Sequence, residues 1–136
     1  VVVTGVIWGS PVAQVVAGLA AVAGHNWSVF LRGEGGRGVS TGIGSLFGMC
    51  WPVAAMVTAV TVTVMVKSRY ISLGSVVGAA FALPVVSLAA VLGFMNPIYL
   101  WYSVPAACAI IFQHRGNIQR LRAGTERRIG GPAILR

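Results

Sequence analysis

The fold is decided by residues 38–66, which read GVSTGIGSLFGMCWPVAAMVTAVTVTVMV and carry no charge. A single membrane crossing by this stretch would leave Arg37 and Arg69 on opposite sides. Pro52 lacks a backbone N–H and interrupts the hydrogen-bond ladder of a helix. We therefore predict a hairpin of two short helices that turns near Cys50-Trp51-Pro52 and returns the chain to the side that it left. One kinked helix is the alternative.

Two further stretches without charge flank this hairpin, residues 1–31 and 70–113. Of the 136 residues, 57% are hydrophobic and 9% are charged, and the mean hydropathy is +0.85. Soluble domains carry about 25% charged residues, and a spanning helix needs about 20 apolar residues. These features exclude a soluble enzyme, a disordered chain and a small disulfide scaffold. We predict an all-α, polytopic membrane protein whose residues 1–136 form a single membrane-embedded domain.

The apolar sequence divides into about five transmembrane or half-spanning helices. Gly9-Ser10-Pro11 and Asn96-Pro97 are natural turns. Together with the hairpin, they give the end of an earlier helix at 1–9 and helices over 12–31, 73–95 and 98–113. Val1 is not a methionine and the chain opens within an apolar run, so we expect an N-terminal part before it.

The net charge of +8 gathers in three places: the segment 32–37, the pair Lys67 and Arg69, and the basic segment 114–136. Short basic loops stay on the cytoplasmic side of a membrane, and the hairpin places all three clusters on that side. The clusters lack the interleaved aromatic residues of a nucleic-acid surface, so we expect no nucleic-acid partner.

Few residues offer acid, nucleophile or metal chemistry. Cys50 and Cys108 lie within apolar stretches, away from any metal-ligand spacing, and we expect both to be buried as small hydrophobes. Glu34 and Glu126 are the only acidic residues, which leaves little for a carboxylate base. We find no Ser-His-Asp set, and we expect neither a metal nor a cofactor.

The most informative loop is segment 33–41, which reads GEGGRGVST and leads into an apolar helix. Its glycines let backbone N–H groups converge on an anion beside Arg37, and the start of the next helix adds to the attraction. Ser40 and Thr41 are candidates to cap that helix or to donate to phosphate oxygens. A flexible turn with a cytoplasmic arginine is the alternative. No Lys-Ser/Thr follows the last glycine, so the segment is not a Walker A loop.

Two more polar segments border the apolar stretches. Arg69 and Ser72 can reach a polar pocket at the helix ends, although Lys, Arg and Tyr also form ordinary interfacial belts. In a helical segment 114–122, His114, Asn117 and Arg120 recur at every third position. The alternative for this segment is an amphipathic tail on anionic headgroups. His25 closes the predicted helix before the glycine loop, in either a functional or a structural role.

Three segments in this order resemble the PlsY-type acyl-phosphate:glycerol-3-phosphate acyltransferases. Residues 24–31 (GHNWSVFL) and 35–41 (GGRGVST) resemble the second motif of that family, Gly-His-x-x-Pro-Val-Phe followed by Gly-Gly-Lys-Gly-Val-Ala-Thr. Residues 69–73 (RYISL) are similar to its Arg-Tyr-Val-Ser-Leu loop, and residues 114–126 (HRGNIQRLRAGTE) to its third motif. Arg37 replaces the family lysine, which keeps the charge and changes the hydrogen-bond geometry. The first motif, Gly-Ser-Gly-Asn-x-Gly-Ala-Thr-Asn, is absent from residues 1–136.

The resemblance implies a seven-helix protein of the bacterial inner membrane with its motifs on the cytoplasmic face. It implies transfer of a fatty acyl group from acyl phosphate to the sn-1 hydroxyl of glycerol 3-phosphate, giving lysophosphatidic acid and phosphate. His114 and Asn117 would then be catalytic. The substrate-binding residues would be Gly35, Gly36, Arg37, Gly38, Ser40, Thr41, Arg69, Ser72 and Arg120. The alternatives are a non-catalytic carrier, an anion-binding membrane subunit and an inactive paralogue.

Overall fold

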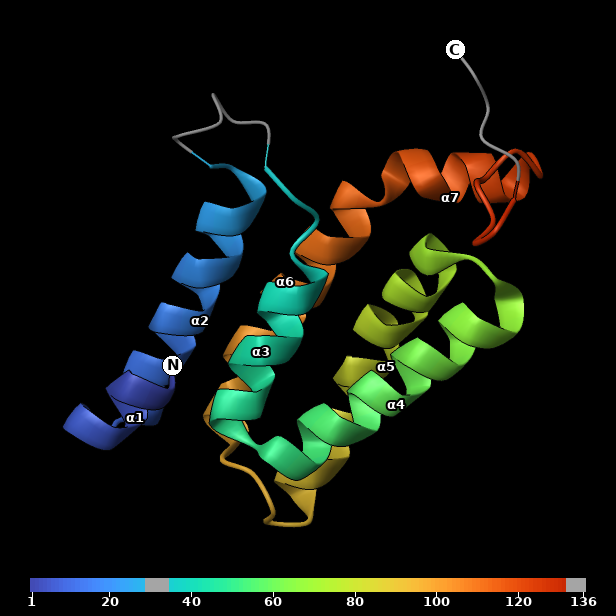
Figure 1. The fold of residues 1–136 in the computed structure, drawn as a ribbon. Helices are drawn as coiled ribbons and strands as arrows, with labels where there is room; N and C mark the ends of the chain where they lie inside the picture. The colour runs from blue at the N-terminus through green and yellow to red at the C-terminus, as the bar shows by residue number, and fades with distance from the viewer. Residues whose placement is uncertain (29–34, 132–136) are drawn as a thin grey trace.

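A computed structural model describes residues 1–28 and 35–131, and helices are the regular structure in those two ranges. The helices are α1 (Val2–Trp8), α2 (Pro11–Asn26), α3 (Val39–Met49), α4 (Trp51–Ser68), α5 (Ile71–Val91), the 3-10 turn η2 (Pro97–Tyr99), α6 (Leu100–Gln113) and α7 (Arg115–Arg122). Helices α2 to α6 form the bundle, and α7 lies across one end of it (Figure 1). The all-α fold predicted from the sequence is confirmed.

The hairpin predicted within residues 38–66 is confirmed, since α3 and α4 meet at Cys50, which is extended (φ −157°, ψ 95°). Pro52 has no N–H, so the carbonyl of Gly48 lacks the partner that a continuous helix would supply. The side chain of Gln14 in α2 donates a hydrogen bond of 3.2 Å to that carbonyl. An unpaired carbonyl in lipid costs several kcal/mol, so α2 stabilises the break in the hairpin.

The outer faces of the bundle are apolar. Helices α4 and α5, with 18 and 21 residues, are long and apolar enough to cross a membrane, and α3 and the segment Pro97–Gln113 are shorter apolar helices. Met56, Val62, Leu88 and Val104 are exposed on the helices, as expected for side chains that face lipid. The prediction that Cys108 is buried is wrong: its side chain is exposed on α6, and Cys50 is half-buried.

Helices α4 and α5 pack closely because small residues line their contact. A Cβ added to Gly78 would collide with Oγ1 of Thr61, and one added to Gly74 would lie 2.7 Å from the Thr61 carbonyl oxygen. Small residues four apart let two helix backbones approach each other in a membrane. This contact sets the position of α5, which begins at the end of the bundle where the lysine and arginine residues lie.

Helix α2 ends at Asn26, whereas the sequence predicted a helix to residue 31, of which residues 29–31 lie outside the described ranges. The cause is a tertiary contact. The carbonyl of His25 accepts a hydrogen bond of 2.9 Å from the N–H of Gly36, so the glycine loop takes the place of the next helical turn.

Helix α5 ends at Val91 rather than at residue 95. Gly93 adopts the left-handed conformation (φ 77°), which glycine alone reaches without strain. The N–H groups of Gly93 and Phe94 then bond back to Ala90 and Ala89, which closes the helix end. The predicted turn at Asn96 is confirmed, but Pro97–Tyr99 forms a 3-10 turn, so α6 begins at Leu100.

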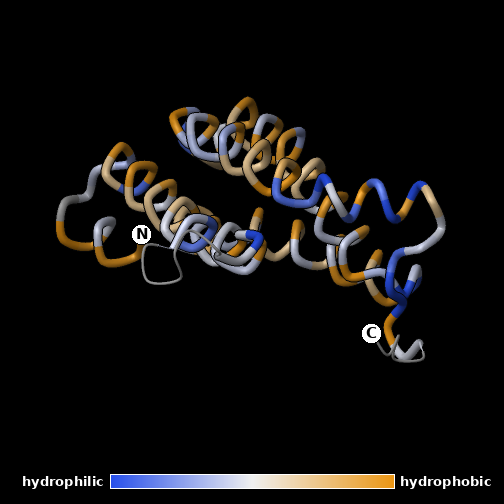
Figure 2. The backbone as a smooth tube through the Cα atoms, turned by 90° about the horizontal axis from the view of Figure 1, so that it is seen from above, coloured by the Kyte–Doolittle hydropathy of each residue, from blue (hydrophilic) through white to orange (hydrophobic). Residues whose placement is uncertain are grey.

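All lysine and arginine side chains in the described ranges belong to one end of the bundle, here called the polar end. It comprises the loop 35–38, the turn between α4 and α5, α7 and the segment 123–131 (Figure 1). Seen from above, the most hydrophilic run of the backbone leads through α7 toward the C-terminus (Figure 2). The turns at Ser10, at Cys50 and at residues 93–96 lie at the other end. The common location predicted for the basic connectors is therefore observed.

Candidate functional site

A cavity of about 480 Å³ opens at the polar end. Its walls come from the glycine loop, the start of α5, α7 and the segment after α7. The lining residues are Arg37, Ile71, Ser72, Asn117, Arg120, Glu126, Arg127, Arg128, Ile129 and Gly130. Four guanidinium groups and one carboxylate give the cavity an excess of positive charge, which favours an anionic ligand.

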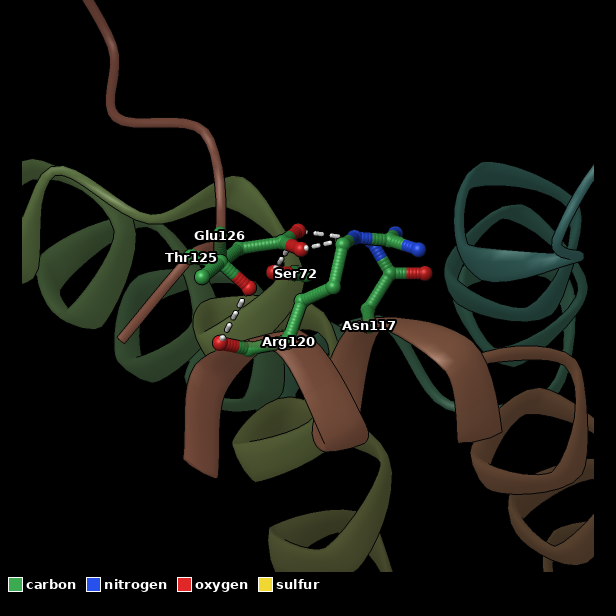
Figure 3. Close-up of polar contacts among 5 residues, drawn as sticks. All are labelled: Ser72, Asn117, Arg120, Thr125 and Glu126. Atoms are coloured by element: carbon green, nitrogen blue, oxygen red, sulfur yellow. Dashed lines mark hydrogen bonds and ion pairs between the residues drawn. The ribbon is translucent and has the colours of Figure 1, made fainter. Parts of the chain in front are cut away.

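The Glu126 carboxylate connects α5 and α7, two walls of this cavity, through hydrogen bonds (Figure 3). Its Oε1 accepts hydrogen bonds of 2.6 Å from Ser72 Oγ and from Asn117 Nδ2, and its Oε2 accepts one of 2.8 Å from Arg120 Nε. Burial raises the pKa of this carboxyl, but the three donors and the charge of Arg120 outweigh burial and hold the pKa below its usual 4.5. Glu126 is thus ionised and fixes the side chains of Ser72 and Asn117, which are buried.

The turn at the end of α7 directs the Glu126 side chain toward its three hydrogen-bond donors. Gly124 is left-handed (φ 69°). Its N–H donates to the Leu121 carbonyl, and the N–H of Thr125 donates to the Arg120 carbonyl. These two bonds form the Schellman end of a helix, and Thr125 Oγ1 adds a weak bond to the same carbonyl (Figure 3). The chain therefore reverses at Gly124 and returns over α7 toward Ser72.

His114 lies at the junction of α6 and α7 and is 1% exposed. Its Nδ1 is 2.8 Å from the carbonyl oxygen of Ile110. Because a carbonyl only accepts, Nδ1 carries the proton and Nε2 is the basic nitrogen of the neutral ring. Burial lowers the pKa of His114 below its usual 6.5, Arg37 acts in the same direction, and the Ile110 carbonyl and Glu126 oppose them. His114 is therefore a neutral base, and it interacts electrostatically with Arg37 and Glu126 of the cavity.

The glycine loop is held against the end of α2 by close backbone contacts. A Cβ on Gly35 would collide with the His25 carbonyl oxygen, and one on Gly36 would collide with Nε2 of the His25 side chain. The N–H of Gly36 is already bonded to His25 and is not free for an anion. These contacts fix the backbone on the N-terminal side of Arg37, whose side chain lines the cavity.

Gly38 is the N-cap of α3 and is left-handed (φ 76°). Ser40 and Thr41 lie in the first turn of α3, and no side chain in the described part of the chain caps that helix. The prediction that Ser40 or Thr41 caps it is therefore wrong, because the cap position belongs to Gly38. A Cβ on Gly38 would lie 2.6 Å from Oδ1 of Asn26, which is 1% exposed.

Arg69 does not line the cavity. Its Nε and Nη2 donate hydrogen bonds of 3.1 and 2.8 Å to the carbonyl of Ile129, and its own carbonyl accepts one of 2.7 Å from the N–H of Ile129. Arg69 thus ties the turn between α4 and α5 to the segment that follows α7.

The structure brings four of the predicted site residues together around the cavity: Arg37, Ser72, Asn117 and Arg120. The cavity is not lined by the other predicted residues: the glycines of the loop, Ser40, Thr41, Arg69 and His114. Sequence reasoning missed Glu126, Arg127 and Arg128. The signal for Glu126 was its rarity, as one of two acidic residues in the chain.

A smaller, apolar cavity of about 40 Å³ lies between α3, α4, α5 and α6. Ile110 and Ser75 line it, one helical turn from His114 and Ser72 respectively. Its other walls are mostly aliphatic and small, and include Val39, Leu46, Val57, Ala79, Ala82 and Ala107. An apolar space thus lies next to the cationic cavity.

These features define a helical, polytopic membrane protein with a cationic cavity where its polar connectors meet. The chain belongs to the glycerol-3-phosphate acyltransferase family, whose profile, described as "Glycerol-3-phosphate acyltransferase", matches residues 1–124.

Named relatives and solved structures agree with this family. The chain is 46% identical over 117 residues to the glycerol-3-phosphate acyltransferase of Synechococcus sp. (strain CC9902), covering 86% of this chain and 56% of that protein. It is 43% identical over 130 residues to the glycerol-3-phosphate acyltransferase 2 of Moorella thermoacetica (strain ATCC 39073 / JCM 9320), covering 95% and 64%. A crystal structure of PlsY (YgiH), an integral membrane glycerol 3-phosphate acyltransferase in its glycerol 3-phosphate form, matches with a TM-score of 0.82 and 31% identity, covering 93% of this chain and 62% of that chain. The chain thus spans little more than half the length of these relatives.

Proposed function

We propose that this chain contributes the catalytic site of an enzyme that transfers a fatty acyl group from acyl phosphate to the sn-1 hydroxyl of glycerol 3-phosphate. The products are lysophosphatidic acid and inorganic phosphate. The observation that carries the proposal is the cationic cavity of Arg37, Arg120, Arg127 and Arg128, next to an apolar cavity within a membrane bundle. Relatives named glycerol-3-phosphate acyltransferase, and a PlsY structure in its lysophosphatidic acid form, support the acylation of glycerol 3-phosphate to lysophosphatidic acid.

The proposed binding roles follow from charge and position. Arg37 holds a phosphate group. The loop Gly35, Gly36 and Gly38, whose Gly36 N–H is bonded to His25, fixes the backbone beside Arg37. Ser40 and Thr41 follow on the first turn of α3. Ser72 and Arg120 contact glycerol 3-phosphate, and Asn117 orients its hydroxyl. Arg69 supports this site through Ile129. The apolar cavity receives part of the acyl chain.

The proposed chemistry is a direct displacement. The sn-1 hydroxyl oxygen attacks the carbonyl carbon of acyl phosphate, the new ester C–O bond forms, and the bond from that carbon to the phosphate oxygen breaks. Phosphate leaves, and its developing charge is stabilised by the guanidinium groups. The hydroxyl proton passes to Nε2 of His114 or to a phosphate oxygen of a substrate. Acyl phosphate is already activated, so positioning supplies much of the acceleration.

We further propose that the polar end faces the cytoplasm of a bacterial cell, across its inner membrane. The support is the concentration of lysine and arginine at that end, since short basic loops stay inside. The segment 114–136 is then a basic cytoplasmic tail of a single membrane domain that covers residues 1–136. Residues 132–136 of this tail lie outside the described ranges.

The decisive experiment uses the full-length protein in membrane vesicles with labelled glycerol 3-phosphate and acyl phosphate. The enzyme is expected to form labelled lipid and to release phosphate, and Arg37→Ala is expected to lower turnover at least 100-fold without loss of insertion. Arg122→Ala is the matched control, because Arg122 is exposed on α7 and does not line the cavity. Accumulation of unchanged glycerol 3-phosphate would instead identify a carrier, and near-normal turnover of Arg37→Ala would exclude the phosphate-binding role of Arg37.

A further inference from the structure

We propose that Arg128 is an additional ligand of a substrate phosphate group and that Arg69 positions it. This inference rests on the proposed function and assigns two more residues to the same cavity. Arg128 belongs to residues 126–130, here called the strap, which run from the Glu126 cluster to the turn between α4 and α5. Arg69 lies in that turn and binds the strap at Ile129.

The strap is fixed at both ends. Glu126 binds Ser72, Asn117 and Arg120 at one end. At the other end, the N–H of Ile129 donates to the Arg69 carbonyl, and the Arg69 side chain donates two hydrogen bonds to the Ile129 carbonyl.

The backbone conformation of Arg69 supports its positioning role. Arg69 is the only non-glycine residue with positive φ (62°) within residues 1–28 and 35–131, a conformation that surrounding contacts must maintain. The strap also requires Gly130, which is left-handed (φ 71°) and whose added Cβ would lie 3.0 Å from Nη2 of Arg69. The backbone conformation of the turn at Arg69 and that of the strap at Gly130 therefore depend on the contact between them.

Arg128 is oriented before any ligand arrives. Its Nε donates a hydrogen bond of 2.7 Å to Oη of Tyr70, and its guanidinium lies 5.2 Å from the centre of the Tyr70 ring. Arg128 lines the cavity. Among the described residues, Glu126 is the one carboxylate of the cavity, and its ion pair is with Arg120. The positive charge of Arg128 therefore lacks an acidic partner there.

The chemistry of the proposed reaction accounts for this extra cation. Two phosphate-bearing molecules occupy the site together, and a terminal guanidinium edge binds phosphate oxygens in a bidentate manner. Arg127 also lines the cavity, but no hydrogen bond to the described part of the chain holds its side chain. Arg128, anchored by Tyr70, is the preorganised ligand.

The test measures binding by calorimetry on the full-length protein in detergent, with glycerol 3-phosphate and with a non-hydrolysable acyl phosphonate as separate probes. Arg128→Gln is expected to weaken one of the two by about 10-fold to 100-fold, the loss expected for one charge-assisted contact. The probe that weakens identifies which phosphate Arg128 contacts. Arg128→Lys is expected to recover part of the affinity, and Arg122→Gln is expected to leave both affinities unchanged.

Two variants test the positioning role. Tyr70→Phe removes only the hydroxyl that holds Nε, and it is expected to weaken the same probe by less than Arg128→Gln does. Arg69→Gln is expected to weaken that probe and to speed tryptic cleavage after Arg127 and Arg128, because it releases the strap.

The inference is overturned if Arg128→Gln binds both probes within twofold of the unchanged protein, or if the unchanged protein binds neither. These outcomes are distinct from failure of the proposed function, which is judged separately by whether labelled lipid forms. If Arg128→Gln does not fold, Tyr70→Phe alone decides, and unchanged affinity in that variant also overturns the inference.

Discussion

Glu126 places a single negative charge among three donors from α5 and α7. The carboxylate neutralises part of Arg120 and keeps the buried Ser72 and Asn117 in fixed rotamers. In the proposed function, a substrate phosphate would therefore meet a set of donors that is already ordered. The cost of ordering them is met during folding rather than at the moment of binding.

The first prediction concerns the acid sensitivity of this cluster. The folded-state pKa of Glu126 lies below its unfolded value of 4.5, so its stabilisation is full above that value and is lost as the pH falls below it through the folded pKa. Glu126→Gln is expected to lower stability near neutral pH by about 1.5–3 kcal/mol and to flatten the decline below pH 4.5. Thermal unfolding of the two proteins between pH 3 and 7 measures both effects. An equally steep acid decline in the variant would contradict this assignment.

The second prediction concerns His114. Burial lowers its pKa below 6.5, so the ring is neutral at pH 7, and any acid limb of kcat that it causes lies below pH 6.5. If Nε2 takes the hydroxyl proton, His114→Gln is expected to reduce kcat about 100-fold or more with little change in KM for either substrate. The pH profile of kcat checks this. A variant that keeps its kcat would leave a substrate phosphate oxygen as the proton acceptor.

For individual residues, the sequence predicted which side chains line the cavity better than it predicted the hydrogen bonds that arrange them. Ser72, Asn117 and Arg120 were candidates by spacing and by their position at apolar boundaries, and the resemblance to the family made them site residues. The structure places all three on the cavity. The role of Glu126 depends on the left-handed turn at Gly124, which the sequence allows but does not require. Arg69 was expected in the pocket, and instead it binds a carbonyl 60 residues away along the chain.

Among the elements, the contact of α4 with α5 determines where Ser72 lies. Gly74 and Gly78 face Thr61 and leave no room for a larger side chain. In lipid, this close packing is a main source of helix association, since burial of apolar groups gains little there.

The third prediction follows from that contact. Gly78→Leu is expected to separate α4 from α5, to lower thermal stability and to abolish activity. Gly44→Leu is the matched control: Gly44 is exposed in the helical α3, and an added Cβ would meet no atom within 4 Å. Size-exclusion chromatography and thermal unfolding in detergent compare the two variants. Equal stability of Gly78→Leu and the unchanged protein would show that the glycine is dispensable.

The elements themselves were largely predictable, and their ends were not. Pro52 and the positions of the charges were enough to predict the hairpin, because both act locally or through the membrane. Helix α2 ends early because Gly36 takes the carbonyl of His25, and this contact between residues 11 apart depends on tertiary packing. The end of α5 depends on the conformation of Gly93, one of 18 glycines in the chain.

For the molecule as a whole, the fourth prediction tests the location of the polar end. In a background without Cys50 and Cys108, Arg122→Cys is expected to react with a membrane-impermeant maleimide only after cells are opened. Phe94→Cys, at the opposite end and 77% exposed, is expected to react in intact cells. Labelling of Arg122→Cys from outside would overturn the cytoplasmic assignment of the site.

Helix α3 has 11 residues, about 16 Å at 1.5 Å per residue, roughly half the thickness of a hydrocarbon core. It therefore begins deeper in the bundle than α2 ends (Figure 1). In the proposed reaction, the acyl donor can then reach the cavity from the side while its long tail stays in the bilayer. The proposed water-soluble acceptor would enter from the polar end, so that the two substrates meet without any lipid leaving its leaflet.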